Sequence, residues 1–265
     1  MIHENHSKFF VMVGHEYVKN MTVSNLVRIL QLFVHVLAGL LLAVTFPVMT
    51  KKMKTLIIKS WCLCLLRIIK VKIKISGQNL SLLKNKFFVA NHISWLDIIV
   101  INSIMPVAFV AKSSVKSWPV FGLMARFTNT IFLDRSSKKS MLMAYQHIKS
   151  SLSHSSIFIF PEGTSTVGKH VKPFHSNFFQ IPVDLCKSTY PVSIEYLKDN
   201  QFTNIPAYVG DDTLVESILR IVKNPGFEAS VTYFKGIDGK NRNRKEIAIN
   251  ANQIINEQIV KKFRS

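Results

Sequence analysis

Short β-rich runs alternate with helical patterns from Val71 to the C-terminus, and this alternation constrains the fold more than any other feature of the chain. Strands that alternate with helices indicate an α/β sheet that is covered on both faces. We therefore expect a mixed, largely parallel sheet flanked by helices. The predicted strands are 71–75, 87–90, 107–111, 130–133, 156–160, 190–196 and 229–234, and the predicted helices are 95–103, 120–127, 139–153, 176–187 and 245–263.

The most apolar part of the chain is the segment 29–49, which precedes the predicted sheet. As a helix it would span about 32 Å, which matches a hydrocarbon core of roughly 30 Å. Basic residues follow it, beginning with Lys51 and Lys52, and Trp61 lies in an amphipathic stretch suited to a membrane interface. The sequence predicts a membrane protein, with 1–70 as an N-terminal membrane-associated helical segment and 71–265 as the domain that carries the sheet.

The orientation of this membrane protein follows from the same basic residues. The positive-inside rule places the basic flank, and with it the domain, on the cytoplasmic side. Lys8, Lys19 and Arg28 lie on the other side of the apolar maximum, so the evidence at the N-terminus is mixed. A transmembrane helix and a helical hairpin that enters one leaflet both fit the pattern.

The net charge of +19, from 34 Lys and Arg against 15 Asp and Glu, predicts an anionic partner. Nucleic acid, an anionic lipid surface and a phosphorylated substrate all carry that charge. The sequence shows no helix-turn-helix, zinc or aromatic stacking motif, which argues against nucleic acid. The 3 cysteines, with two of them in a C-x-C pattern, suggest neither a disulfide framework nor a metal site.

His92 and Asp97, in the segment 91–97 (Asn-His-Ile-Ser-Trp-Leu-Asp), are candidates for a general-base pair. Within one α-helix the two side chains would point about 140° apart, so the pair can form only if His92 precedes the helix. Ser94 and Asp97 match a capping box, which predicts that the helix begins after His92. The alternative is that Asp97 only caps the helix and that His92 is a surface residue.

Four polar residues follow predicted strands by one to three positions, namely His92, Lys112, Arg135 and Glu162. Functional groups collect at the carboxyl ends of the strands in sheets of this kind. We therefore expect these side chains to share one edge of the sheet. The alternative is that strand ends are polar because loops are.

Four ordered blocks resemble those of the glycerolipid acyltransferase family, which includes 1-acyl-sn-glycerol-3-phosphate acyltransferase. Residues 91–97 resemble the family's NHxxxxD (HX4D) block, 130–135 a block that ends in arginine, 160–164 the FPEGT block, and 190–194 a proline-containing block. The resemblance runs from about Lys59 to the C-terminus. It implies an acyltransferase catalytic domain that takes part in phospholipid biosynthesis.

The resemblance also implies roles for individual residues. His92 would take the proton of a lysolipid hydroxyl, and Asp97 would orient His92. Lys112, Arg135, Glu162, Gly163 and Thr164 would bind the acceptor head group. The expected partners are acyl-ACP or acyl-CoA as donor, a lysolipid acceptor and an anionic membrane, with no metal and no cofactor.

Two departures from the family pattern concern the acceptor. Ser165 stands where the family usually has arginine, and 173–178 lacks the usual Lys-x-Gly element. Both changes resemble the branch that acylates lyso-ornithine lipids. We expect 1-acyl-sn-glycerol 3-phosphate as the first candidate acceptor and a lyso-ornithine lipid as the alternative. An inactive membrane adaptor is the alternative from another class of protein.

Overall fold

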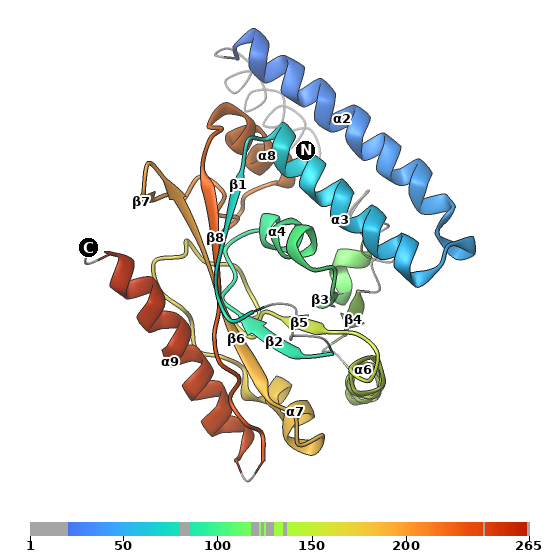
Figure 1. The fold of residues 1–265 in the computed structure, drawn as a ribbon, viewed down its shortest axis with the longest axis vertical. Helices are drawn as coiled ribbons and strands as arrows, with labels where there is room; N and C mark the ends of the chain where they lie inside the picture. Colours follow the sequence, from blue (N-terminus) through green and yellow to red (C-terminus); the bar gives the residue numbers. More distant parts are fainter. Residues whose placement is uncertain are drawn as a thin grey trace, which may run out of the picture.

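One sheet organises the chain after its N-terminal helices, with strands in the order β1-β8-β6-β2-β5-β3-β4 and β7 paired to β6 (Figure 1). The computed structural model describes residues 21–79, 85–117, 122, 125, 130–134, 137–240 and 242–263. The strands are β1 (Lys72–Gly77), β2 (Phe87–Ala90), β3 (Ala108–Lys112), β4 (Ile131–Leu133), β5 (Ile157–Ile159), β6 (Thr189–Lys198), β7 (Gln201–Phe202) and β8 (Glu228–Tyr233).

Helices cover both faces of this sheet (Figure 1). The α-helices are α2 (Val23–Val44), α3 (Lys51–Ile68), α4 (Leu96–Ile104), α6 (Lys138–Ser151), α7 (Gln180–Asp184), α8 (Leu214–Lys223) and α9 (Arg244–Phe263). Short 3-10 helices occur at η1 (Phe46–Val48), η3 (Ser113–Ser117) and η4 (Ser176–Phe179).

Parallel pairing dominates the sheet. Strand β2 lies between β5 and β6 and runs parallel to both, and β3 runs parallel to β4 and β5. Strand β1 is parallel to β8, whereas β6 and β8 are antiparallel. The prediction of a mixed, largely parallel sheet is confirmed. Because parallel strands end at the same edge, the segments that follow β2, β3, β4 and β5 leave the sheet on one side.

Alternating side chains of the strands build a core on each face of the sheet. Phe88 packs in the layer formed by α3, α4 and α8, where Leu66 and Val222 are buried. The neighbouring Phe87 packs in the opposite layer, formed with α6, α7 and α9, where Ile247 is buried. The buried strands β2 and β5 therefore carry apolar residues on both faces, as parallel strands do.

Helices α2 and α3 form a hairpin that turns through η1 and lies outside α4 (Figure 1). The rings of His35 and Trp61 stack with 4.6 Å between their centroids, and Trp61 Nε1 donates to the His35 carbonyl oxygen over 3.2 Å. A Cβ atom at Gly39 would lie 2.4 Å from Trp61 Nε1, so this close approach requires a glycine. Arg28 ties the hairpin to α8 through the carbonyl oxygen of Val222, at 3.3 Å.

The two helices of the hairpin have different surroundings. Cys62 and Leu65 of α3 are buried in the core layer with α4. Helix α2 exposes Leu30 and Phe33 and is long and apolar enough to cross a membrane. The apolar helix predicted from 29–49 is confirmed, but it begins at Val23 and ends at Val44, before the turn that contains Pro47. The division at residue 70 stays a prediction.

Most predicted elements match the structure closely. Each of the seven predicted strands lies within two residues of an observed one, and the helices predicted from 95, 139 and 245 correspond to α4, α6 and α9. The predicted helix 176–187 is divided into η4 and α7. The predicted helix 120–127 falls largely outside the described residues.

Besides the short 3-10 helices η1 and η3, the strand β7 and the α-helix α8 are absent from the prediction. Strand β7 has 2 residues, which is too short for a periodic pattern. Helix α8 does carry a sequence signal, because Thr213 and Glu216 form a capping box in which each side chain accepts from the other residue's backbone N–H.

We expect Leu30→Asp and Phe33→Asp each to weaken co-sedimentation with anionic lipid vesicles while leaving the melting temperature in detergent unchanged. These side chains are 63% and 67% exposed on α2, so a carboxylate there would contact lipid rather than the core, where a charge is costly. Ile249→Asp is the matched control, because Ile249 is 57% exposed on the distant helix α9. Equal vesicle binding by all three variants would mean that the membrane contact lies elsewhere.

Candidate active site

His92 and Asp97 meet at the carboxyl end of β2. His92 Nδ1 lies 2.8 Å from Asp97 Oδ2, and α4 begins at Leu96, so His92 precedes the helix as predicted. The same oxygen accepts the backbone N–H groups of Ile93 and Ser94 at 2.8 and 3.0 Å. The capping geometry is offset by one residue from the prediction, because the Ser94 hydroxyl accepts the N–H of Leu96.

The imidazole of His92 is held in one orientation. Its ring stacks on Phe160 with 4.1 Å between centroids and 16° between planes. Asp97 is fully buried, whereas 21% of the His92 side chain is exposed. Because the buried carboxylate faces Nδ1, we assign the proton to Nδ1, which leaves Nε2 as the basic nitrogen. The arrangement suits a general base that removes a proton from a bound hydroxyl.

The turn 160–164, which follows β5, holds the backbone of His92. Glu162 Oε1 accepts the His92 N–H at 2.7 Å, and Oε2 accepts the Lys172 N–H at 2.9 Å. On the other side, the Thr166 N–H donates to the His92 carbonyl oxygen over 2.9 Å. Both oxygens of the buried Glu162 are thus in use, and its carboxylate fixes two loops relative to each other.

Burial also sets the ionisation of Glu162. Desolvation raises the pKa of this carboxyl to about 7, and the two backbone N–H groups from Lys172 and His92 oppose that rise. A buried carboxyl of this kind next to a histidine is typical of functional sites, although structural networks produce such shifts too.

Gly163 and Thr164 complete the turn. Gly163 has a φ of 70°, in the left-handed region that favours glycine, and its N–H donates to the Phe160 carbonyl oxygen over 3.2 Å. Thr164 is exposed. These two residues lie at the surface of the site, where an acceptor head group could reach them.

Ser165 has a local structural contact. Its hydroxyl donates to the carbonyl oxygen of Tyr208, and the N–H of Tyr208 donates to the Ile93 carbonyl oxygen over 2.9 Å. Arg220 braces this loop through Asp212 at 2.8 Å and through the Ile205 carbonyl oxygen at 3.0 Å. The loop 203–213 is therefore fastened to both blocks of the site.

The structure gives less information on the two remaining predicted site residues, Lys112 and Arg135. Lys112 is the exposed last residue of β3, on the carboxyl edge of the sheet that His92 and Glu162 share. Arg135 lies outside the described residues. The groups His92, Asp97, Glu162, Gly163 and Thr164 are brought together by the adjacency of β2 and β5.

Two residues that join the site to β6 were not predicted. The hydroxyl of Tyr196 donates to Asp97 Oδ1 over 2.7 Å. The Asn91 side chain pairs with Ile194, donating to its carbonyl oxygen and accepting its N–H, both at 2.8 Å. Both contacts join the end of β2 to β6, and only the strand order reveals that these strands are neighbours.

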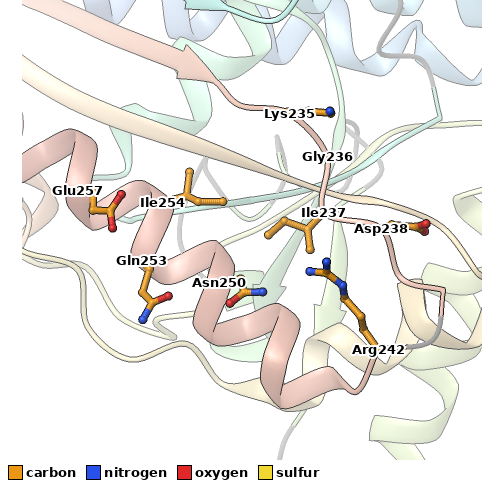
Figure 2. A pocket seen from close by; sticks show the side chains of 9 residues that line it. All are labelled: Lys235, Gly236, Ile237, Asp238, Arg242, Asn250, Gln253, Ile254 and Glu257. Carbon is orange, nitrogen blue, oxygen red and sulfur yellow. The ribbon is translucent and has the colours of Figure 1, made fainter.

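A cavity of about 490 Å³ lies elsewhere, between α9 and the segment that follows β8 (Figure 2). Ile237 in its wall pairs with Thr189, the first residue of β6. Since β6 runs parallel to β2, this cavity is at the opposite end of the strands from His92. Among the described residues, no group of three His, Cys, Asp or Glu could hold a metal ion.

Known proteins resemble the chain in both sequence and fold. A family model described as Acyltransferase matches residues 72–195, a range that includes His92, Asp97 and the turn 160–164. A crystal structure of the 1-acyl-sn-glycerophosphate acyltransferase PlsC from Thermotoga maritima has a TM-score of 0.66 and 19% sequence identity, covering 92% of this chain and 95% of that chain. At this identity the likeness concerns the fold.

Three of the sequence relatives carry two different names. A lyso-ornithine lipid O-acyltransferase from Pseudomonas aeruginosa is 27% identical over 195 residues, which cover 74% of this chain and 75% of that protein. A protein of the same name from Rhizobium meliloti is 31% identical over 191 residues, 66% of this chain and 65% of that protein. A 1-acyl-sn-glycerol-3-phosphate acyltransferase from Neisseria gonorrhoeae is 32% identical over 135 residues, 50% of this chain and 52% of that protein.

We expect Glu162→Gln to remove a pH-dependent part of the stability. The pKa of Glu162 is about 7 in the folded protein against an ordinary value of 4.5. The contribution of Glu162 to the free energy of unfolding is therefore fully present below the pKa of 4.5 and is lost as the pH rises through the folded-state pKa of about 7. The reason is that the carboxyl group loses its proton at a lower pH in the unfolded chain than in the folded protein. The decrease in the free energy of urea unfolding from about pH 5 to about pH 8 should be smaller in the variant.

The substitution should also lower stability at every pH, because an amide has one acceptor oxygen for the two N–H groups that Glu162 binds. Glu257→Gln, at an exposed position of α9, is the control and should keep the pH dependence of the wild type. If the stability of Glu162→Gln had the same pH dependence as that of the wild type, burial would not raise the pKa of Glu162.

Proposed function

Since the chain belongs to the glycerolipid acyltransferase family and is an acyltransferase of lysolipids, we propose that His92 is its general base and that its acceptor is a lyso-ornithine lipid. The contact that supports the first part is the 2.8 Å hydrogen bond between His92 and the buried Asp97. The placement of Ser165 supports the second part.

In the proposed reaction, Nε2 of His92 takes the proton of the acceptor hydroxyl while the oxygen attacks the carbonyl carbon of the donor thioester. Asp97 stabilises the imidazolium that forms. When the tetrahedral intermediate collapses, the C–S bond breaks and the leaving thiolate takes the proton from His92. The acyl group passes directly to the acceptor, so the chain needs no nucleophile of its own.

The acceptor proposal rests on the position where the family usually has arginine. Guanidinium groups bind phosphate through two parallel hydrogen bonds, which makes arginine the strongest side chain for that purpose. Ser165 occupies this position, and its hydroxyl donates to the backbone of Tyr208. Ser165 itself therefore offers no cation to a phosphate. A lyso-ornithine lipid, which has no phosphate, does not require one.

A second candidate acceptor is 1-acyl-sn-glycerol 3-phosphate. The net charge of +19, the exposed Lys112 at the sheet edge and Arg135 in the second block favour an anionic head group. The relative from Neisseria gonorrhoeae carries the name of that activity. A charge-assisted contact contributes about 1.5–3 kcal/mol, so Lys112 and Arg135 together could replace the missing arginine.

We further propose acyl-ACP or acyl-CoA as the donor, without a metal or another cofactor. The α2–α3 hairpin would attach the enzyme to an anionic membrane, with the outer face of α2 in the lipid and the catalytic domain on the cytoplasmic side. The packing of α2 along α3 and its contact with α8 favour a hairpin on one leaflet over a helix that stands across the bilayer.

We expect His92→Ala to abolish acyl transfer without a change in melting temperature or in vesicle binding, because it removes the proton acceptor and leaves Asp97 in its backbone contacts. General-base help is worth about 10²–10⁴-fold. Asp97→Asn should lose less activity than His92→Ala, because the base is kept and its orientation is disturbed. Near-normal turnover by a well-folded His92→Ala protein would exclude His92 as the base.

The acceptor is tested by assaying the purified protein with lyso-ornithine lipid and lysophosphatidic acid side by side, with each donor class. We expect a higher kcat/KM with lyso-ornithine lipid. Ser165→Arg should move the preference toward lysophosphatidic acid because it adds a phosphate-binding cation, and Ser165→Ala is the control for losing the Tyr208 contact. Turnover of lysophosphatidic acid alone would establish the second candidate.

A further inference from the structure

The two carboxylate oxygens of Asp97 have different partners. Oδ2 accepts from His92 Nδ1 and from the backbone N–H groups of Ile93 and Ser94, which precede α4. Oδ1 accepts from the hydroxyl of Tyr196 over 2.7 Å. Asp97 and Tyr196 are both fully buried, so solvent does not take part in this contact.

The length of β6 puts Tyr196 in this position. In the parallel register of β2 and β6, Ala90 lies beside Val192, and the Asn91 side chain continues the pairing to Ile194. Strand β6 then runs on to Lys198, past the end of β2. Because side chains alternate along a strand, Tyr196 lies on the same face as Val192 and Ile194, which is the face that α4 covers.

We propose that Tyr196 is a positioning residue for acyl transfer, whose hydroxyl fixes the plane of the Asp97 carboxylate and thereby the orientation and tautomer of His92. This inference rests on the proposed role of His92 as the base. Tyr196 acts through Asp97 and not on the substrate, since its side chain has no exposed surface.

The chemistry of the contact supports this role. A carboxylate held through one oxygen can rotate about its Cβ–Cγ bond, whereas donors on both oxygens fix its plane. The second donor also spreads the negative charge over both oxygens, which moderates the attraction of Asp97 for a proton on His92. Burial, together with the charge of Asp97, raises the pKa of Tyr196 well above its ordinary value, so the phenol remains a donor.

The chain offers a matched control in Tyr233 on the neighbouring strand β8. Its ring is 1% exposed in the same core layer and packs edge-on against Phe88, with 5.8 Å between centroids. Within the described part of the chain, its hydroxyl has no hydrogen-bond partner. Tyr233→Phe therefore removes a buried hydroxyl from the same environment without touching Asp97.

The experiment compares Tyr196→Phe, Tyr233→Phe and the wild type in steady-state acyl transfer as a function of pH. We expect Tyr196→Phe to lower kcat by about tenfold, short of the 10²–10⁴-fold that general-base help supplies, with KM for the acceptor unchanged. The acidic limb of its pH–rate profile should move to higher pH. Without the Tyr196 hydrogen bond, the Asp97 carboxylate carries more negative charge and favours the protonated form of His92, which cannot act as a base. Tyr233→Phe should match the wild type in kcat and in profile.

Combining Tyr196→Phe with Asp97→Asn separates positioning from a general loss of packing. If Tyr196 acts through the Asp97 carboxylate, the tyrosine substitution should lower kcat much less in the Asp97→Asn background than in the wild type. A Tyr196→Phe enzyme with the kcat of the wild type and an unchanged acidic limb would overturn the inference. The same fold-decrease in kcat on adding Tyr196→Phe to the wild type and to Asp97→Asn would also overturn it. Activity that survives His92→Ala would instead refute the proposed base, independently of Tyr196.

Discussion

The site depends on a carboxylate that has been removed from water. Burying an ionised carboxyl group costs several kcal/mol unless hydrogen bonds and opposite charges replace its hydration. Asp97 meets this requirement with three kinds of donor, namely the His92 ring, the backbone N–H groups of Ile93 and Ser94 ahead of α4, and the Tyr196 hydroxyl on β6. These elements must therefore be correctly assembled before the charge can be accommodated, which couples formation of the His92–Asp97 pair to formation of the sheet.

The turn 160–164 acts on the same histidine from the opposite side. The sequence assigns this turn to the acceptor, but the geometry adds a second role, because Glu162 in the turn binds the N–H of His92, and Thr166 just after the turn binds its carbonyl oxygen. Asp97 orients the ring while the turn fixes the backbone. The two blocks are about 70 residues apart in the chain and contiguous in space because β2 and β5 are neighbours.

Local sequence patterns were sufficient for most of the fold. Apolar runs identify the strands, and the capping signal at Ser94 places His92 ahead of α4, which makes a His92–Asp97 contact possible but leaves open that Asp97 only caps the helix. Tyr196 and Asn91 were not predictable, because their roles depend on β6 lying beside β2, and strand order is a tertiary property. The position of Glu162 after a strand is predictable from the sequence, but the direction of its carboxylate oxygens is not, because that depends on the segment around Lys172.

Helix α3 faces two environments whose requirements differ. Its inner positions, including Cys62, Leu65 and Leu66, are fixed in size and shape by the core that they share with α4. Its outer positions, such as Met53 and Leu56, are exposed and have no such neighbours to satisfy. Substitutions on the outer face can therefore accumulate during evolution without repacking of the core. Inner-face changes would have to be compensated within the enzyme itself, so the two faces should diverge at different rates.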